Sequence, residues 1–460
     1  MSVQPGSHVS RTRPPEPLPP KPYQFPRPAV AKLANGLEVF VSTRRHLPLV
    51  SVLVGVGAGG SADPIGREGL AVMTSRLLTE GAGRRGAAKV AETVEQLGAS
   101  LDASAGWELS SIRLAALSAH LGPALNLMAD VTFRPRFDPV EVQRELNQRQ
   151  AEILSDRDNP RSVAAERSAR FVYGRHRYGA QLAGDEDSVG ALGAPQLRAF
   201  HARHFRAGNA FVVLVGDVTP ERGVKLVERA FGEWQDGRPR RVDVPAPRRP
   251  GPTAVRLVDQ PGAAQSEIRV SQPGVARTHP EYFPLLVLNA VLGEAFGSRL
   301  YFNLREKHGY TYGVSSYFSM RRGRGPFVAG AGVHTPVTAK AVREFLREMR
   351  RIRDDAPSRQ EMSDAKGFLA GGLAVELQSN GSVADRVAES VMYDLPDDYM
   401  DTYRDCIHAV TSADVVRAAK RVIDPDRMVV TVVGDAAKVR RDLERLLPTK
   451  MYTPLGRPRK

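Results

Sequence analysis

Hydrophobic positions fall into two long stretches of the chain, and each stretch changes from a strand-like to a helix-like period. In the first, apolar runs at 37–43 and 49–59 precede an alternating segment at 99–117, a pattern typical of strands. Apolar positions then recur three and four residues apart. This second period predicts helices over 123–130, 139–155 and 159–172.

The second stretch repeats this order. Its pattern predicts a strand at 266–274, a long helix over 282–304, strands over 310–318 and 327–333, and helices over 336–354 and 358–379. Strands followed by helices, twice, indicate an α+β protein and not a doubly wound parallel sheet.

The two stretches also end alike. In each, a helix leads into a continuous apolar strand that finishes with Gly-Asp, at Gly216-Asp217 and again at Gly434-Asp435, and a further helix follows. A match between the two halves of the chain indicates an internal duplication. We therefore expect two tandem homologous α+β units, each with a mixed or antiparallel sheet covered by helices.

These patterns divide the chain into five parts. A Pro-rich tail is expected to be extended, either as a solvated leader or as a strap across a neighbouring domain, and less readily as an SH3-type ligand. A Pro- and Arg-rich stretch without an apolar period indicates a linker between the units. The predicted parts are a tail at 1–28, a unit at 29–234, a linker at 235–253, a unit at 254–450 and a basic tail at 451–460.

Composition narrows the function classes. Of the 65 basic residues only 11 are lysine, and the formal charge is +14, so the excess is almost all arginine. The arginines are scattered and do not form one stripe interleaved with aromatic residues, which favours a high-GC genome over nucleic-acid binding. The single cysteine, Cys406, excludes an internal disulfide and a Cys-based zinc finger, and we interpret it as a small half-buried hydrophobe.

No apolar run approaches the roughly 18 residues that a membrane span needs. The first residues lack the apolar core of a secretory signal, so the sequence as written predicts a cytoplasmic protein. A misassigned start codon would conceal a signal peptide, and the protein would then be periplasmic.

The stretch 66–82, GREGLAVMTSRLLTEGA, follows a Gly-rich loop and is a glycine-bounded apolar helix pattern. It resembles the metal-site helix of the pitrilysin/insulinase family of zinc peptidases, where H-x-x-E-H places two zinc ligands one helical turn apart with a base between them. Here the ligand positions fall on Val72 and Arg76, and the base position on Ser75. A valine cannot donate to zinc, and a guanidinium repels it.

The resemblance covers nearly the whole chain after the tail and implies the half-clamshell fold of that family. It places the family's third ligand, a Glu, at Glu152, with Glu145 two turns earlier on the same helix face. One carboxylate without its two imidazoles is not a zinc site. We therefore interpret Glu152 as a relic or a solvated helix charge and expect no metal in this chain.

The second feature of the resemblance is LREKHGYTYGVSSYF at 304–318. In active members a matching Arg and Tyr face the zinc site and hold the substrate backbone and the oxyanion, which implies these roles for Arg305 and Tyr312. Gly309 is suited to end the helix, with Arg305 in its last turn and Tyr312 on the strand that follows. Without the resemblance, a helix-terminal Arg and a Tyr packed on a sheet would explain both residues.

Other candidate sites are weaker. His201 and His204 lie three residues apart, but no further ligand is near them in sequence, and a structural role is expected. Ser363 and Lys366 match S-x-x-K without the accompanying motifs. The Gly-rich loop at 55–64 lacks a downstream acidic ribose partner and is interpreted as a tight loop.

The resemblance implies a non-metal-binding subunit, like the alpha subunit of the mitochondrial processing peptidase. Such a subunit would pair with a homologue that carries H-x-x-E-H and zinc, supply Arg305 and Tyr312 to substrate and transition-state binding, and bind unfolded peptides. The alternative is an inert structural scaffold, like the core subunits of the respiratory cytochrome complex. An independent enzyme with a relocated metal site is disfavoured, because no His pair at i, i+4 exists.

Overall fold

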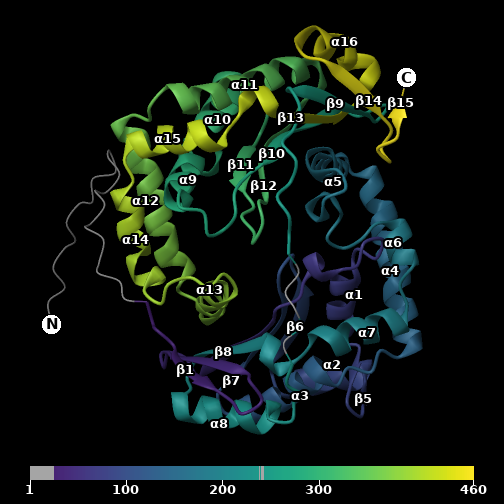
Figure 1. Cartoon of the computed structure of the whole chain (residues 1–460), viewed down its shortest axis with the longest axis vertical. Coiled ribbons are helices and arrows are strands. Elements are labelled where there is room, and N and C mark those ends of the chain that lie inside the picture. The colour runs from purple at the N-terminus through teal and green to yellow at the C-terminus, as the bar shows by residue number, and fades with distance from the viewer. Residues whose placement is uncertain (1–24, 238, 240–242, 460) are drawn as a thin grey trace, which may run out of the picture.

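The computed structural model describes residues 25–237, 239 and 243–459. It contains two large sheets at opposite ends of the molecule, with helices around and between them (Figure 1). The α+β class with two similar units, predicted from the repeated pattern, is confirmed.

The first unit is built on a six-stranded sheet of order β1-β2-β8-β3-β7-β6. All neighbours are antiparallel except β2 and β8, which run parallel. Its strands are β1 (Ala29–Lys32), β2 (Glu38–Thr43), β3 (Leu49–Val56), β6 (Ser100–Ala105), β7 (Ser110–Leu117) and β8 (Ala210–Gly216), and a short hairpin adds β4 (Gly81–Ala82) and β5 (Arg85–Gly86). Its helices are α1 (Leu70–Leu77), α2 (Ala87–Gln96), α3 (Leu121–Phe133), α4 (Pro139–Asp158), α5 (Pro160–Tyr173), α6 (Glu186–Gly190), α7 (Ala194–His204) and α8 (Pro220–Phe231).

The second unit has a seven-stranded sheet of order β11-β12-β10-β13-β9-β14-β15. Here β9 runs parallel to both β13 and β14, and the other pairs are antiparallel. Its strands are β9 (Ala254–Asp259), β10 (Gln265–Pro273), β11 (Val314–Phe318), β12 (Pro326–His334), β13 (Val429–Gly434), β14 (Thr449–Tyr452) and β15 (Pro458–Arg459). Its helices are α9 (Tyr282–Asn289), α10 (Arg299–Tyr301), α11 (Thr338–Asp354), α12 (Arg359–Glu376), α13 (Asn380–Met392), α14 (Tyr399–Ala409), α15 (Ser412–Val422) and α16 (Ala436–Leu446).

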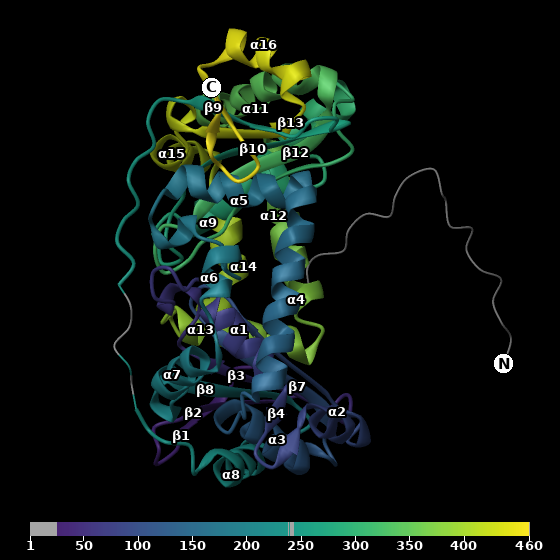
Figure 2. The ribbon, with the colours of Figure 1, turned by 90° about the vertical axis from the view of Figure 1, so that its right-hand side faces the viewer.

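Each unit contributes one helix that packs on the sheet of the other unit. Helix α5, from the first half of the chain, packs on β10 and β13 of the second sheet, and α13, from the second half, packs on β3 and β8 of the first (Figures 1 and 2). Each sheet is therefore covered on both faces. This explains why every residue of β8 and β13 is buried and nearly all of them are apolar.

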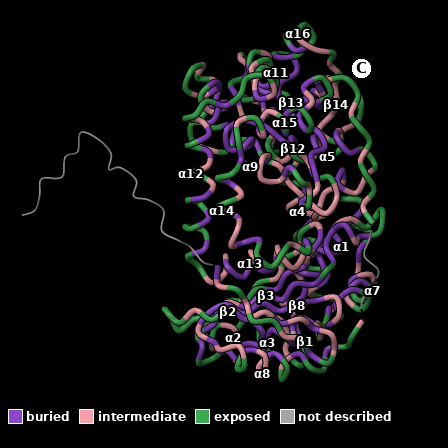
Figure 3. Tube along the Cα trace, turned by 60° about the vertical axis from the view of Figure 1, so that its left-hand side comes forward, coloured by how far each residue is buried: buried purple, intermediate pink, exposed green. Residues whose placement is uncertain are grey.

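Burial follows this arrangement. Residues of one face of β3 and β8, such as Val54 and Leu214, join a core under α1, α3, α7 and α8. Residues of the other face, such as Leu53 and Val213, join the core of the second unit through α13. Figure 3 shows the buried positions gathered around β3 and β8 in one half and around β12 and β13 in the other.

The long helix predicted over 282–304 is not continuous. Helix α9 runs on into a π-helical turn, Ala290–Glu294, the chain then leaves the helix, and α10 leads into a second π-helical turn, Phe302–Lys307. Ala295 is extended and Gly297 has φ +156°, a backbone conformation that favours glycine.

The stretch Tyr282–Lys307 is also the one helical segment in the described part of the chain that is long and apolar enough to span a membrane. In its most apolar window, 61% of the segment is buried inside the protein. Burial in the second core accounts for its apolar character.

Two of the predicted tails are structured where they are described. Residues 451–459 are not a free basic tail, because β14 pairs with β9 and then turns back as the hairpin strand β15. Residues 1–24 of the Pro-rich tail lie outside the described residues. Its end is a strap: Phe25 is buried in the second core, and Arg27 pairs with Asp401 of α14 at 2.5 Å.

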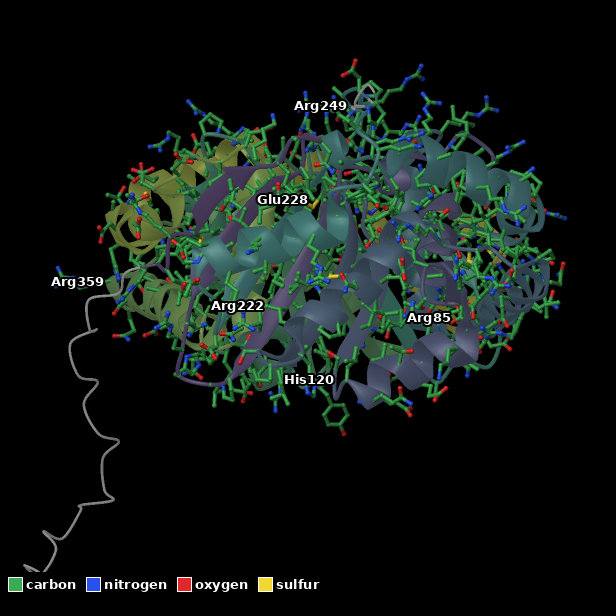
Figure 4. The ribbon with its side chains drawn as sticks, turned by 90° about the horizontal axis from the view of Figure 1, so that it is seen from below. Arg85, His120, Arg222, Glu228, Arg249 and Arg359 are labelled. Carbon is green, nitrogen blue, oxygen red and sulfur yellow. The ribbon has the colours of Figure 1, made fainter. Side chains whose placement is uncertain are left out.

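Basic side chains are spread over the molecule. Seen from below, the labelled arginines Arg85, Arg222, Arg249 and Arg359 lie at separate places and do not form one cluster (Figure 4). Many arginines are paired within the chain, for example Arg85 with Asp130 at 2.9 Å.

Candidate functional site

Helix α1 has a constrained start. Gly69 has φ +93°, and a side chain there would meet the carbonyl oxygen of Ala183 at 2.7 Å. The Asp63 carboxylate, carried by the preceding loop, accepts hydrogen bonds from the backbone N–H groups of Gly69 (2.9 Å) and Ala71 (2.8 Å). Burial raises the pKa of Asp63 to about 7, against the opposing effect of these N–H donors.

The positions that correspond to the metal motif lie on α1 as the sequence predicts. Val72 is half-buried, and Ser75 is fully buried with its hydroxyl oxygen lacking a hydrogen-bond partner. Neither side chain carries a carboxylate or an imidazole, so neither a base nor a ligand is present at these two positions.

Arg76 and Glu152 meet across the interface of α1 and α4. The two guanidinium Nη atoms of Arg76 donate to the two carboxylate oxygens of Glu152, each at 2.9 Å. Arg149, one turn earlier on α4, donates to the same carboxylate at 3.1 Å and also to the carbonyl oxygen of Ala183. The hydrogen bond from Arg76 is the main reason why the pKa of Glu152 is lowered.

The interpretation of Glu152 as a solvated helix charge is therefore wrong. The carboxylate is about one third exposed and serves as the shared acceptor of two arginines. Sequence reasoning missed Arg149, although its position three residues before Glu152 is a helical ion-pair spacing. Glu145 is buried on the same helix and pairs with Arg144 at 2.9 Å.

This arrangement does not fit a zinc ion. The guanidinium of Arg76 is planar and permanently charged. It hydrogen-bonds to both carboxylate oxygens of Glu152, which a metal ion would need as a ligand. Within residues 25–237, 239 and 243–459, no group of three His, Cys, Asp or Glu side chains is placed to hold a metal. At the positions that align with the family's metal motif, this chain therefore has an ion pair between two helices.

In the second unit, Arg305 lies in the π-helical turn that precedes β11. Its guanidinium sits 4.7 Å from the ring centre of Tyr301 and 6.0 Å from that of Phe296, and it approaches Glu306 at 3.6 Å. The side chain remains 39% exposed. Gly309 ends the helical segment with φ +62°, as predicted, and its N–H donates to the carbonyl oxygen of Arg305.

Tyr312 is in the turn before β11 and not on the strand, so that part of the prediction is wrong. Thr311 fixes the turn, because its buried hydroxyl is shared between the carbonyl oxygens of Gly332 (2.7 Å) and Gly313 (2.9 Å). Tyr312 itself is 84% exposed. None of the hydrogen bonds found among the described residues involves its phenol.

Tyr312 lines a cavity of about 760 Å³ on the outer part of the second sheet. The floor comes from β10, β11 and β12, and the first turn of α5 forms one wall through Arg161 and Ser162. Glu267 and Arg269 of β10, both largely buried, face this cavity and lie 3.5 Å apart. Arg305 is not among the lining residues, so the structure does not join Arg305 and Tyr312 in one cavity.

The histidines have structural surroundings. Nε2 of His201 lies 2.8 Å from the carbonyl oxygen of Thr132, and its ring stacks on Phe205. Burial lowers the pKa of His201 and of His204 to about 4 each. Lys366 donates to the carbonyl oxygen of His408, away from the S-x-x-K pairing, and Cys406 is half-buried.

The fold is that of a peptidase-like scaffold, and helix α1 has Val72, Ser75 and Arg76 at the positions of the metal motif. The class is therefore a peptidase-like protein without the ligands of a metal site. Comparison with known families agrees: residues 39–186 match the model described as "Insulinase (Peptidase family M16)", and residues 191–369 match "Peptidase M16 inactive domain". The chain belongs to the M16 peptidase family, the insulinase family that the sequence resembles.

Relatives extend over most of the chain. An uncharacterized zinc protease of Streptomyces coelicolor is 26% identical over 87% of this chain and 88% of its own length. A solved structure of a peptidase M16 inactive domain from Pseudomonas fluorescens is 28% identical, covers 89% of this chain and 98% of that chain, and superposes with a TM-score of 0.84. A protease from Helicobacter pylori, 19% identical with a TM-score of 0.83 over 89% of this chain and 99% of that chain, shares the fold.

Proposed function

We propose that this chain is the non-metal-binding, active-site-completing subunit of a heteromeric M16 metallopeptidase. Its partner would be a homologous subunit that carries H-x-x-E-H and the zinc ion. The observation that carries the proposal is Tyr312, which stands 84% exposed on a turn clamped by buried Thr311, while the metal helix of the same chain is closed by an ion pair. A phenol in that position contributes little to folding and is available to another molecule.

The second sheet offers a place for an unfolded peptide. Strand β11 is the outermost strand of its sheet, so its outer backbone groups can pair with an added strand. Backbone pairing gives affinity without strong sequence choice. Tyr312 lies in the turn directly before this strand, so its O–H would lie at one end of a peptide paired there. Arg305 lies in the preceding helical turn and does not line the cavity of Tyr312, so the proposal requires it to reach the substrate from beside that cavity. The phenol O–H and the guanidinium N–H groups would then stabilise negative charge that develops on the substrate carbonyl.

Co-expression with a zinc-bearing M16 homologue tests this function. In the purified complex, we expect Tyr312→Phe and Arg305→Ala each to lower kcat/KM for a peptide by about a hundredfold, as for loss of one oxyanion donor. Matched controls are Tyr452→Phe, a half-buried tyrosine on β14, and Arg343→Ala, an exposed arginine on α11. Unchanged kcat/KM in both test variants would show that the assigned role is wrong.

An inert scaffold remains the second candidate, because the Arg76–Glu152 pair has turned the old metal site into a contact that joins two helices. Affinity purification of the tagged chain distinguishes these two functions. Recovery of a zinc peptidase in stoichiometric amount supports the active-site-completing subunit, and recovery of a membrane redox complex supports the inert scaffold. We expect the peptidase partner in the cytoplasmic fraction.

A further inference from the structure

A second cavity, of about 390 Å³, lies between the end of the interunit linker and the second unit. Its wall is strongly basic. Five arginines line it: Arg248 and Arg249 from the linker, Arg324 from the loop between β11 and β12, Arg421 from α15, and Arg427 from the turn before β13. Asp424 is the one carboxylate among the described lining residues, and Figure 4 shows Arg249 at the outer edge of the molecule.

The positive charge is only partly balanced inside the chain. Arg249 pairs with Asp424 at 2.7 Å, and Arg421 pairs with buried Glu281 at 2.6 Å. Nε of Arg324 and Nη1 of Arg427 donate only to backbone carbonyl oxygens, of Gly274 (2.9 Å) and Pro250 (3.2 Å).

For Arg248, the contacts found among the described residues include no partner at all. Three of the five lining arginines, Arg248, Arg324 and Arg427, therefore have no carboxylate partner among the contacts found in the described residues.

The backbone around the cavity is held in place. The buried amide of Gln272 donates to the carbonyl oxygen of Val422 and accepts from the N–H of Asp424 at 2.9 Å. The linker ends at Thr253, whose hydroxyl donates to the carbonyl oxygen of Pro425 at 2.7 Å and accepts from the N–H of Met428 at 2.9 Å. A ligand would thus meet a wall with its backbone already set, which lowers the entropy cost of binding.

We propose that this cavity binds a small polyphosphate anion, as a diphosphate or triphosphate group that is either free or part of a nucleotide. Guanidinium groups match phosphate oxygens with paired hydrogen bonds and stay charged at every physiological pH. The volume lies in the range of small-ligand sites. A polyvalent anion would also relieve the mutual repulsion of the unpaired guanidinium groups.

The bound anion has a structural consequence. It would connect the linker to the loop that carries Arg324, and the carbonyl oxygen of Arg324 accepts a hydrogen bond from the Tyr173 hydroxyl of α5 at 2.9 Å. Helix α5 belongs to the first half of the chain. The site therefore ties together the linker, the second unit and the helix that the first unit places on it, and binding should raise the melting temperature.

Calorimetric titration of the full chain with pyrophosphate, tripolyphosphate and ATP at constant ionic strength tests the proposal. We expect saturable binding, and we expect Arg248→Gln/Arg324→Gln to weaken it at least about tenfold, since each change removes a charge-assisted hydrogen-bond donor. The control Arg343→Gln/Arg359→Gln removes the same charge from exposed positions outside the cavity and should leave the affinity unchanged. Circular dichroism establishes that both variants are folded.

The ligand series identifies the source of the anion. Equal affinity for ATP and tripolyphosphate indicates free polyphosphate, and tighter binding of ATP indicates a nucleotide. The proposal is overturned if none of the three anions binds at millimolar concentration, or if both double variants weaken binding equally. It is also overturned if an acidic peptide or single-stranded DNA binds at this cavity in place of the phosphates.

Discussion

The two units share a plan but treat their functional positions in opposite ways. In the first, the positions of the metal motif are buried or paired, and Arg76 and Glu152 now hold α1 against α4. In the second, Tyr312 is exposed and has no role in the core. The positions aligned with the metal motif serve packing and ion pairing in this chain, whereas Tyr312 is exposed and serves neither. This contrast is the reason why the proposed function is placed on the second unit.

The sharpest way to break this comparison is to rebuild the metal site. We expect Val72→His/Ser75→Glu/Arg76→His to bind about one zinc per chain, because two imidazoles one turn apart would join Glu152 as ligands. Metal analysis after gel filtration measures the number of zinc ions bound per chain. Adding Glu152→Gln to this variant should lower the affinity at least about tenfold, and a triple variant without zinc would show that α1 and α4 are wrongly aligned with the family motif.

The exchanged helices make the two units depend on each other. Val383 of α13 is fully buried in the second core, and α13 packs on the first sheet. We expect Val383→Ala to cost about 2 kcal/mol of unfolding free energy and to speed hydrogen exchange in β3 and β8. Val375→Ala, at a 66% exposed position of α12, is the matched control. Faster exchange confined to the second unit would argue against this coupling.

The ion pair at the old metal site should have a measurable but smaller effect. Glu152→Gln leaves the guanidinium groups of Arg76 and Arg149 without their shared carboxylate, and we expect a loss of about 1–2 kcal/mol, reduced by partial exposure. Urea denaturation measures it. Glu92→Gln, in an exposed pair with Lys89, is the control and should lower the unfolding free energy clearly less than Glu152→Gln. Equal effects of the two changes would mean that the site is merely solvated.

The smallest expected effect is a pH dependence. Burial lowers the pKa of His201 to about 4, below its ordinary value near 6.5, so the unfolded chain binds more protons between these values. Stability from this residue is complete above pH 6.5 and is lost as the pH falls towards 4. His201→Gln should reduce the fall in unfolding free energy between pH 7.5 and 5 by on the order of 1 kcal/mol. An unchanged slope would contradict a half-buried imidazole that stays neutral in the folded chain.

Local signals were sufficient for much of the fold. The sequence pattern predicted helices α4, α5 and α12 to within a few residues, because each has a Pro, Asn or Ser start and buried positions that recur at helical spacing. It failed over 282–307, where closely spaced apolar residues conceal the break between the two π-helical turns. It also failed at 451–459, where a short basic hairpin depends on the neighbouring strand β9.

For the candidate site, the sequence alone supplied the alignment of Val72, Ser75, Arg76 and Glu152 with a metal motif and the helix stop at Gly309. These depend on residue type and spacing, which local sequence contains. Only the tertiary structure decided that Arg76 pairs with Glu152. It also decided that α5 and α13 each pack on the sheet of the other unit. The same holds for the five arginines, distant in sequence, that line one cavity. These contacts join residues that are far apart in the sequence. They form only when the helices and sheets pack together, because burial and charge pairing between distant residues exist only in the folded chain.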